Sequence, residues 1–300
     1  MSVTWSRTKT VSRTEIRRRW RVTKANTAQL ISIGLLCLFF LPGVLAVLAG
    51  AYFGGSALQA GDLATPVATI REIAVTLWLF AAAFGGFRGY SSLLDPDCQD
   101  GLLTTISHGQ LLAGLLLAEA VVFGPPIGLL AAGAGIAFAV GSGSLLAAPA
   151  IFLAIGLLVS TGFLTGLGVV LVFKNGGVRS RLLSRLRTVA FAALFLVYMG
   201  VIVTNAFGVL LDPFYWLLTP TPIGWVGELG LLSTTADGSW LLAGSGLVVS
   251  ILALGLSGPV LSRLTAWLWY ADGIEPRETD TAPTTAGGSR LSRLLPQPMA

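Results

Sequence analysis

The chain is poor in charge, in histidine and in cysteine, and each shortage argues against a class of protein. Charged residues make up 11% of the 300 residues, apolar residues make up 54%, and the mean hydropathy is +0.80. A soluble domain carries about 25% charged residues to cover its surface. The composition therefore argues against a soluble globule, a disordered chain and a basic nucleic-acid-binding domain. It is the composition of an integral membrane protein.

Motifs for hydrolytic or metal-dependent chemistry are also missing. The three lysines, Lys9, Lys24 and Lys174, do not end a Gly-x-x-x-x-Gly-Lys-Ser/Thr loop, and there is no His-Glu-x-x-His. One histidine and two cysteines cannot build a zinc site of the His/Cys type. We therefore expect no catalytic residue, no metal site and no cofactor held by this chain.

Six apolar runs are long enough to cross a bilayer, which takes about 20 residues. They cover residues 28–53, 71–90, 110–139, 145–173, 188–211 and 239–270. In the third run, Pro125 and Pro126 remove two backbone donors and are expected to kink or break the helix. The fold class that follows is an all-α, polytopic membrane protein with six transmembrane helices.

The basic residues predict how these spans are oriented. With the N-terminus inside, eighteen of the nineteen lysines and arginines fall on the cytoplasmic side, and only Arg71 falls outside. Both termini are then cytoplasmic, and the net charge of +5 is a topology signal that requires no nucleic-acid partner. Residues 1–27 form a cytoplasmic amphipathic segment, 28–270 a membrane domain, and 271–300 a disordered cytoplasmic tail.

The segment 12–24 predicts a helix that lies on the inner leaflet. Ser12 and Glu15 have the spacing of a capping box, which starts a helix. An isoleucine and a tryptophan four residues apart share one face, and arginines occupy the others, near anionic lipid. The alternative is a plain basic stretch that only sets topology. The predicted surface residues are Ile16, Arg17, Trp20 and Arg21.

Two connections between spans carry more apolar residues than a solvated linker needs. Residues 88–110, on the cytoplasmic side, favour a short amphipathic helix, since Asp97 can cap it and Asp100 can lie in its first turn. Such a helix is a natural docking element for a partner. Residues 212–238, on the outer side, are too rich in proline to span, so we expect short helices that dip into the outer leaflet.

Glu119 is the one carboxylate deep within a predicted span, and the sequence offers it no basic partner there. A charge at that depth costs roughly 2.5 kcal/mol or more, so it usually faces a cavity or a partner. Two interpretations stay open. Glu119 is either part of a substrate path or proton-linked site, or a structural residue that bonds a neighbouring helix or reaches the membrane surface.

Close helix packing is predicted by pairs of glycines four residues apart, either within one subunit or across a dimer. The pairs fall at 50/54, 85/89, 124/128 and 162/166.

The whole pattern resembles the membrane subunit of an ABC exporter of the second type. That family has a cytosolic surface helix, six spans, a coupling helix between spans two and three, and two short outer helices between spans five and six. Its coupling stretch tends to read Glu-x-Gly-Thr-Leu-Glu-Leu-Leu-x-x-Thr-Pro-Val-Ser-Arg, followed by Leu-Leu-x-Gly-Lys. Residues 100–114 here read Asp-Gly-Leu-Leu-Thr-Thr-Ile-Ser-His-Gly-Gln-Leu-Leu-Ala-Gly, which is similar but shortened. Ile106, His108 and Leu115 stand where the family has proline, arginine and lysine.

The resemblance implies a permease subunit that works as a homodimer or with a paralogous permease in the cell membrane. ATP and magnesium would bind on separate nucleotide-binding ATPase subunits. The residues that would contact the ATPase are Asp97, Asp100, Leu102, Leu103, Thr104, Ser107 and His108. Two other functions stay open: a secondary transporter or channel that needs no ATPase, and a membrane scaffold that transports nothing.

Overall fold

The structure, a computed structural model, describes residues 5–94, 106–179, 207–234 and 238–270, and within these ranges it is helical without a strand. The helices are α1 (Trp5–Ala25), α2 (Thr27–Ala60), α3 (Pro66–Arg88), η1 (Gly89–Leu93), α5 (His108–Ser142), α6 (Ala147–Arg179), α8 (Phe207–Leu218), α9 (Pro222–Gly227), η2 (Glu228–Gly230) and α10 (Trp240–Trp269).

Five of these helices are long and apolar enough to cross a membrane, which confirms an all-α, multi-pass architecture. They correspond to five of the six predicted spans. The sixth, predicted at 188–211, lies outside the described residues apart from 207–211, which belong to α8. The five are Leu30–Ala60, Pro66–Ser91, His108–Ser142, Ala147–Gly176 and Trp240–Trp269.

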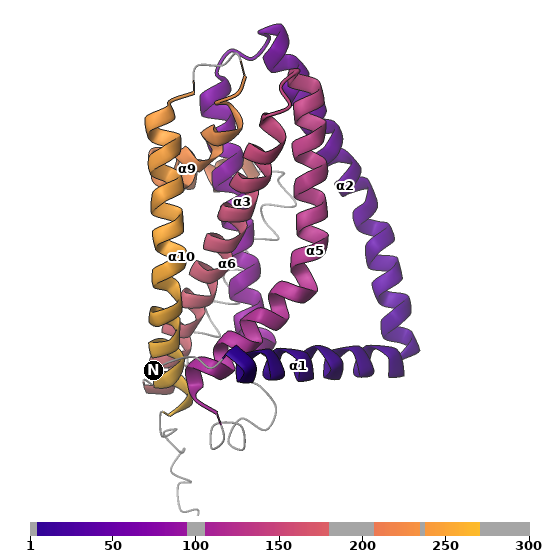
Figure 1. The fold of residues 1–300 in the computed structure, drawn as a ribbon, viewed down its shortest axis with the longest axis vertical. Helices are drawn as coiled ribbons and strands as arrows, with labels where there is room; N and C mark the ends of the chain where they lie inside the picture. The colour runs from indigo at the N-terminus through magenta and orange to yellow at the C-terminus, as the bar shows by residue number, and fades with distance from the viewer. Residues whose placement is uncertain (1–4, 95–105, 180–206, 235–237, 271–300) are drawn as a thin grey trace, which may run out of the picture.

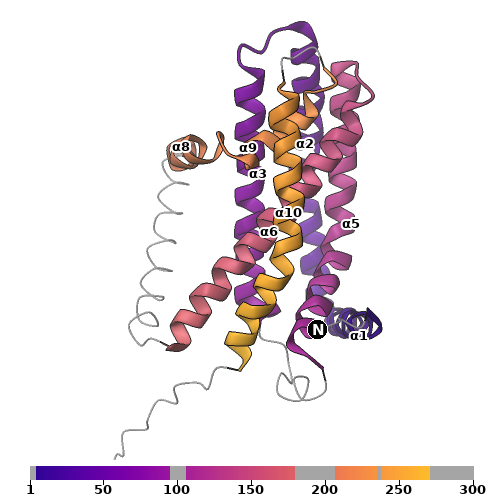
Figure 2. The same ribbon diagram turned by 60° about the vertical axis from the view of Figure 1, so that its left-hand side comes forward.

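The helix α1 lies across one end of the bundle, while α2, α3, α5, α6 and α10 run along its length (Figures 1 and 2). Only Asn26 separates α1 from α2. We use "α1 end" for this end of the bundle and "opposite end" for the other.

The predicted start of α1 at Ser12 was wrong, because α1 begins at Trp5. Ser12 is instead buried in mid-helix on the face that packs against α5.

Glycines allow α3 and α6 to approach each other closely. A Cβ added at Gly85 would meet the carbonyl of Phe163, and one added at Gly166 would meet the carbonyl of Ala82. The pairs at 85/89 and 162/166 therefore act within the subunit, as the sequence allowed. By contrast, a Cβ at either member of the pairs 50/54 and 124/128 would find no other heavy atom within 4 Å.

The helix α5 continues through Pro125 and Pro126, so these prolines do not break it. Its lower part runs obliquely to its upper part (Figure 1), consistent with a bend where proline removes backbone hydrogen bonds. α5 ends at Ser142 and is capped by Gly143, whose φ of 67° is in the left-handed region that favours glycine. The turn that follows leads directly into α6.

Buried leucines form the core at the α1 end, where η1, α5, α6 and α10 meet. The outward faces of the long helices carry exposed leucine, valine and phenylalanine, as a lipid-facing surface requires. The core residues at the α1 end are Leu93, Leu94, Leu111, Leu112, Leu115, Leu167, Leu171, Leu261 and Trp269.

Candidate functional site

Glu119 lies buried in α5 and accepts hydrogen bonds from arginines on two other helices. Its Oε1 is 2.8 Å from Nη1 of Arg19 on α1 and 2.7 Å from Nη2 of Arg88 on α3. Its Oε2 accepts a further bond, of 3.2 Å, from Nε of Arg88. The Glu119 side chain is 3% exposed, whereas those of Arg19 and Arg88 are 24% and 19% exposed. These three residues are termed the three-helix node.

The node corrects the expectation that Glu119 has no basic partner. Arg19 was expected on a surface helix and Arg88 at the cytoplasmic end of the second span, and neither was expected beside Glu119. In the fold, α1 crosses α5 and Arg88 is the last residue of α3, so that both guanidinium groups reach the same carboxylate. Glu119 therefore lies at the level of α1, about a third of the way along α5.

A second carboxylate holds Arg19 from the side of α1. Glu15 accepts a 2.8 Å bond from Nε of Arg19 and a 3.2 Å bond from Nη2 of Arg18. Burial raises the pKa of Glu15, but the bonds from Arg19 and Arg18 lower it more, and the net shift is downward. Burial likewise lowers the pKa of Arg19, and its bonds to Glu15 and Glu119 more than reverse this. Arg19 thus stays charged between two carboxylates.

α1 also packs on α5 at a second point, which requires a glycine. A Cβ built on Gly114 would lie 2.6 Å from Cγ1 of Val11 and 3.1 Å from the carbonyl oxygen of Thr8. Thr8 itself is buried here. Together with the bond from Arg19 to Glu119, this contact fixes both the position and the rotation of α1.

Arg88 leads directly into the connection between α3 and α5. Its guanidinium carbon lies 5.3 Å from the centre of the Phe123 ring, a cation–π contact. The next residues form the π-helical turn η1, a type of turn that is frequent at functional sites. After η1, the carbonyl of Leu94 accepts a 2.9 Å bond from Nε1 of Trp269 on α10. The connection therefore starts from a fixed position.

Its far end is anchored as well. Ser107 is the N-cap of α5, and its Oγ accepts a 3.4 Å bond from the backbone N–H of Gln110. His108 is the first residue of α5, and its ring meets the ring of Tyr270 edge-on at 5.8 Å. Both belong to the start of α5. The other predicted ATPase contacts, Asp97, Asp100, Leu102, Leu103 and Thr104, lie outside the described residues.

The predicted surface residues of α1 divide into two groups. Arg17, Trp20 and Arg21 are exposed, and Trp20 also lies under the Lys24 ammonium group at 4.9 Å from the ring centre. Ile16 is half-buried. This agrees with an amphipathic helix that has one face on the protein.

The opposite end of the bundle has an ion pair of its own, around Glu228. This carboxylate is fully buried and accepts bonds from Nε of Arg71 at 2.7 Å and from the backbone N–H of Ser239 at 2.9 Å. It joins η2 to the start of α3 and to the N-cap of α10. Gly227 and Gly246 let α9 lie close against α3 and α10 respectively.

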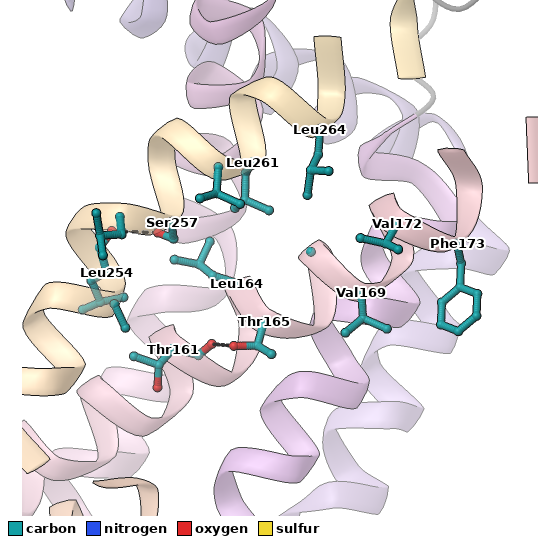
Figure 3. A pocket seen from close by; sticks show the side chains of 14 residues that line it. Thr161, Leu164, Thr165, Val169, Val172, Phe173, Leu254, Ser257, Leu261 and Leu264 are labelled. Carbon is teal, nitrogen blue, oxygen red and sulfur yellow. Dashed lines mark hydrogen bonds between the residues drawn. The ribbon is translucent and has the colours of Figure 1, made fainter. Parts of the chain in front are cut away.

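An apolar groove of about 600 Å³ runs between α6 and α10 (Figure 3). Its hydroxyl groups bond to their own helices: Thr161 to Leu157, Thr165 to Thr161 and Ser257 to Leu254. The groove therefore offers hydrocarbon contact and little hydrogen bonding.

Comparisons of the chain with protein-family models, curated proteins and solved structures found no match. Within the described part of the chain, no three histidine, cysteine, aspartate or glutamate side chains are grouped so that they could hold a metal ion. The function proposed below therefore rests on the ion-pair clusters around Glu119 and Glu228 at the two ends of the bundle.

Sequence reasoning missed both ion-pair clusters. Arg71 and Glu228 are 157 residues apart in the chain, and nothing local to either predicts the other. A signal was present, since Arg71 is the one basic residue predicted on the outer side and Glu228 lies in an apolar outer segment. Each charge in so apolar a setting needs a partner of opposite sign.

Proposed function

We propose that this chain is the permease subunit of an ATP-binding-cassette exporter of the second type, which forms the translocation pathway and couples to separate ATPase subunits. The observation that supports this most is the arrangement at the α1 end. A crosswise helix, the π-helical turn after α3 and the N-cap of α5 all lie at this end, and ion pairs to Glu119 join α1 and α3 to α5.

In this proposal the connection between α3 and α5 is the coupling element. ATP hydrolysis on the partner moves residues 97–108, and the two anchored ends pass the displacement to the spans. Arg88 would carry it to Glu119 and Arg19, because all three share one hydrogen-bonded node. Glu119 then acts in coupling between α1 and the spans, rather than as a group on the substrate path.

The outer helices and the sixth span complete the proposed topology. α6 ends at the α1 end, whereas α8 lies at the level of α9, toward the opposite end (Figure 2). A sixth span at 188–211 would connect these two levels. α9 and η2, which pack between α3 and α10, would then be the outer-leaflet helices. α8 also contacts α3, because Tyr215 shares a 2.8 Å hydrogen bond with Thr76.

The proposed working unit is a homodimer or a pair with a paralogous permease, in the cell membrane, with both termini in the cytoplasm. The ATPase subunits would hold ATP and magnesium, so this chain would carry out no catalysis. Placing the α1 end in the cytoplasm is supported by the charges, since Arg71 is the one basic residue predicted at the other end.

The test is a pull-down of the tagged chain from native membranes in mild detergent, with partners identified by mass spectrometry. We expect a stoichiometric ATPase that carries a P-loop. Binding should be lost in Asp100→Lys and in a Leu102→Ala/Leu103→Ala double variant. Glu72→Lys is the matched control, because Glu72 is an exposed carboxylate on α3 near the opposite end and should leave the ATPase bound.

Other outcomes would favour the two competing functions. Flux driven by an ion gradient without ATP would indicate a secondary transporter or channel. A stable partner complex with neither ATPase nor flux would indicate a scaffold. Retention of the ATPase by all variants would argue against the coupling role of residues 97–108.

A further inference from the structure

The basic residues of α1 fall into an inward and an outward set. The inward arginines bond to Glu15 and Glu119, as described above. The outward set is exposed and has no carboxylate within 4 Å in the described part of the chain. It comprises Arg7, Lys9, Arg13, Arg17, Arg21 and Lys24.

Three of the outward arginines form a ladder. Arg13, Arg17 and Arg21 recur every four residues, so successive guanidinium groups lie one helical turn apart on the same face. Like charges at this spacing destabilise a helix unless an anion lies between them. The ladder therefore lacks a neutralising partner within the described structure, in contrast to Arg19.

The setting of the ladder identifies the partner. α1 lies crosswise at the end of five apolar helices, which places it at the depth of lipid headgroups. Trp5 and Trp20 are 67% and 59% exposed, and indole rings favour that depth. The bonds to Glu119 and the close contact at Gly114 fix the rotation of α1, so the ladder keeps facing away from α5.

We propose that the outward face of α1 binds the headgroups of acidic phospholipids in the adjacent leaflet. Phosphate oxygens accept bonds from guanidinium groups one turn apart, and the negative charge relieves the repulsion along the ladder. The indole of Trp20 lies at the boundary between headgroup and acyl chain. This interface depends only on α1 and its docking, and it holds whether or not an ATPase partner exists.

The test uses the purified full-length chain in phosphatidylcholine vesicles that contain a minority of phosphatidylglycerol. Spin-labelled versions of the two lipids report how strongly each associates with the protein. We expect the wild type to prefer phosphatidylglycerol by roughly fivefold or more, the scale of one effective basic residue at a membrane surface. The preference should fall as salt is raised.

Two triple variants separate charge from fold. Arg13→Gln/Arg17→Gln/Arg21→Gln should bring the preference close to parity, whereas Arg13→Lys/Arg17→Lys/Arg21→Lys should keep most of it. Equal association of both lipids with the wild type, or an unchanged preference in the glutamine variant, would overturn the proposal. So would an acidic protein that co-purifies through this ladder in the absence of any lipid preference.

Discussion

At the scale of single residues, the two buried glutamates are neutralised in different ways. Glu228 has one arginine and one backbone N–H, and it holds the short helix η2 against α3 and α10. Glu119 is shared by Arg19 and Arg88, which come from different helices. A shared acceptor can keep one arginine while the other moves away. Glu119 is thus suited to join elements that move relative to each other, and Glu228 to fix elements in place.

We expect Glu119→Gln to destabilise the protein by about 1–3 kcal/mol. Removing one partner of a fully buried ion pair costs about 3–5 kcal/mol, but Arg19 and Arg88 are partly exposed and would be partly solvated. The measurement is the free energy of unfolding in mixed micelles. Transport, if the protein transports, should also fall at normal abundance.

The matched control for this variant is Glu72→Gln. Glu72 is an exposed carboxylate on α3 without an ion pair in the described part of the chain. We expect a change near zero there, since exposed charges contribute little. Equal effects of the two variants would show that the node does not stabilise the fold.

The lowered pKa of Glu15 predicts how α1 responds to acid. A carboxyl whose pKa is lower in the folded than in the unfolded state stabilises the fold above its unfolded pKa. That stabilisation is lost as the pH falls through the folded value. Docking of α1 on α5 should therefore be constant from pH 7 to about 5 and weaken below about pH 4. A fluorescence distance between α1 and α5 measures this.

Glu15→Gln is the control for the acid response. The variant has no carboxyl to protonate at this position, so α1 should lose the part of the pH dependence that Glu15 provides. A wild-type acid response in Glu15→Gln would assign the effect to another group.

At the scale of helices, hydropathy predicted the long elements well because the bilayer sets their length and composition. Capping and proline patterns predicted the ends and breaks of helices less well. Ser12 and Glu15 suggested a helix start, but the helix extends back to Trp5 because Thr8 and Ser12 are buried against α5. Pro125 and Pro126 left α5 continuous. The site was the least predictable part, since its partners come from separate helices and meet only through tertiary packing.

The glycine pairs give a prediction about helix packing. Gly166→Ala should destabilise the protein by about 1–3 kcal/mol, because its Cβ would overlap the carbonyl of Ala82 on α3. Gly124→Ala should be neutral or slightly stabilising, because open space surrounds it and alanine favours helix. Unfolding in mixed micelles measures both. A larger cost at Gly124 than at Gly166 would mean that the pair 124/128 packs against another chain.

At the scale of the whole molecule, the uneven charge predicts which end faces the cytoplasm. Cys98 belongs by sequence to the connection between α3 and α5, whose described ends lie at the α1 end, while Cys37 lies within α2. An impermeant thiol reagent should therefore label Cys98 from the cytoplasmic side only, in inverted vesicles and not in intact cells. Cys98→Ser should abolish the labelling, which controls for Cys37. Labelling of Cys98 in intact cells would reverse the topology.

After the one-residue joint at Asn26, α2 contacts the rest of the bundle mainly through its C-terminal half. At the near end α2 continues from α1, which is clamped to α5, and at the far end Gly55 and Gly141 bring it against α5 again. Between these points the side chains of α2 are largely exposed. Tilting α1 in the plane of the membrane would therefore shift or bend this middle section of α2. A neighbouring molecule or lipid chain can lie along that middle section without displacing an existing contact.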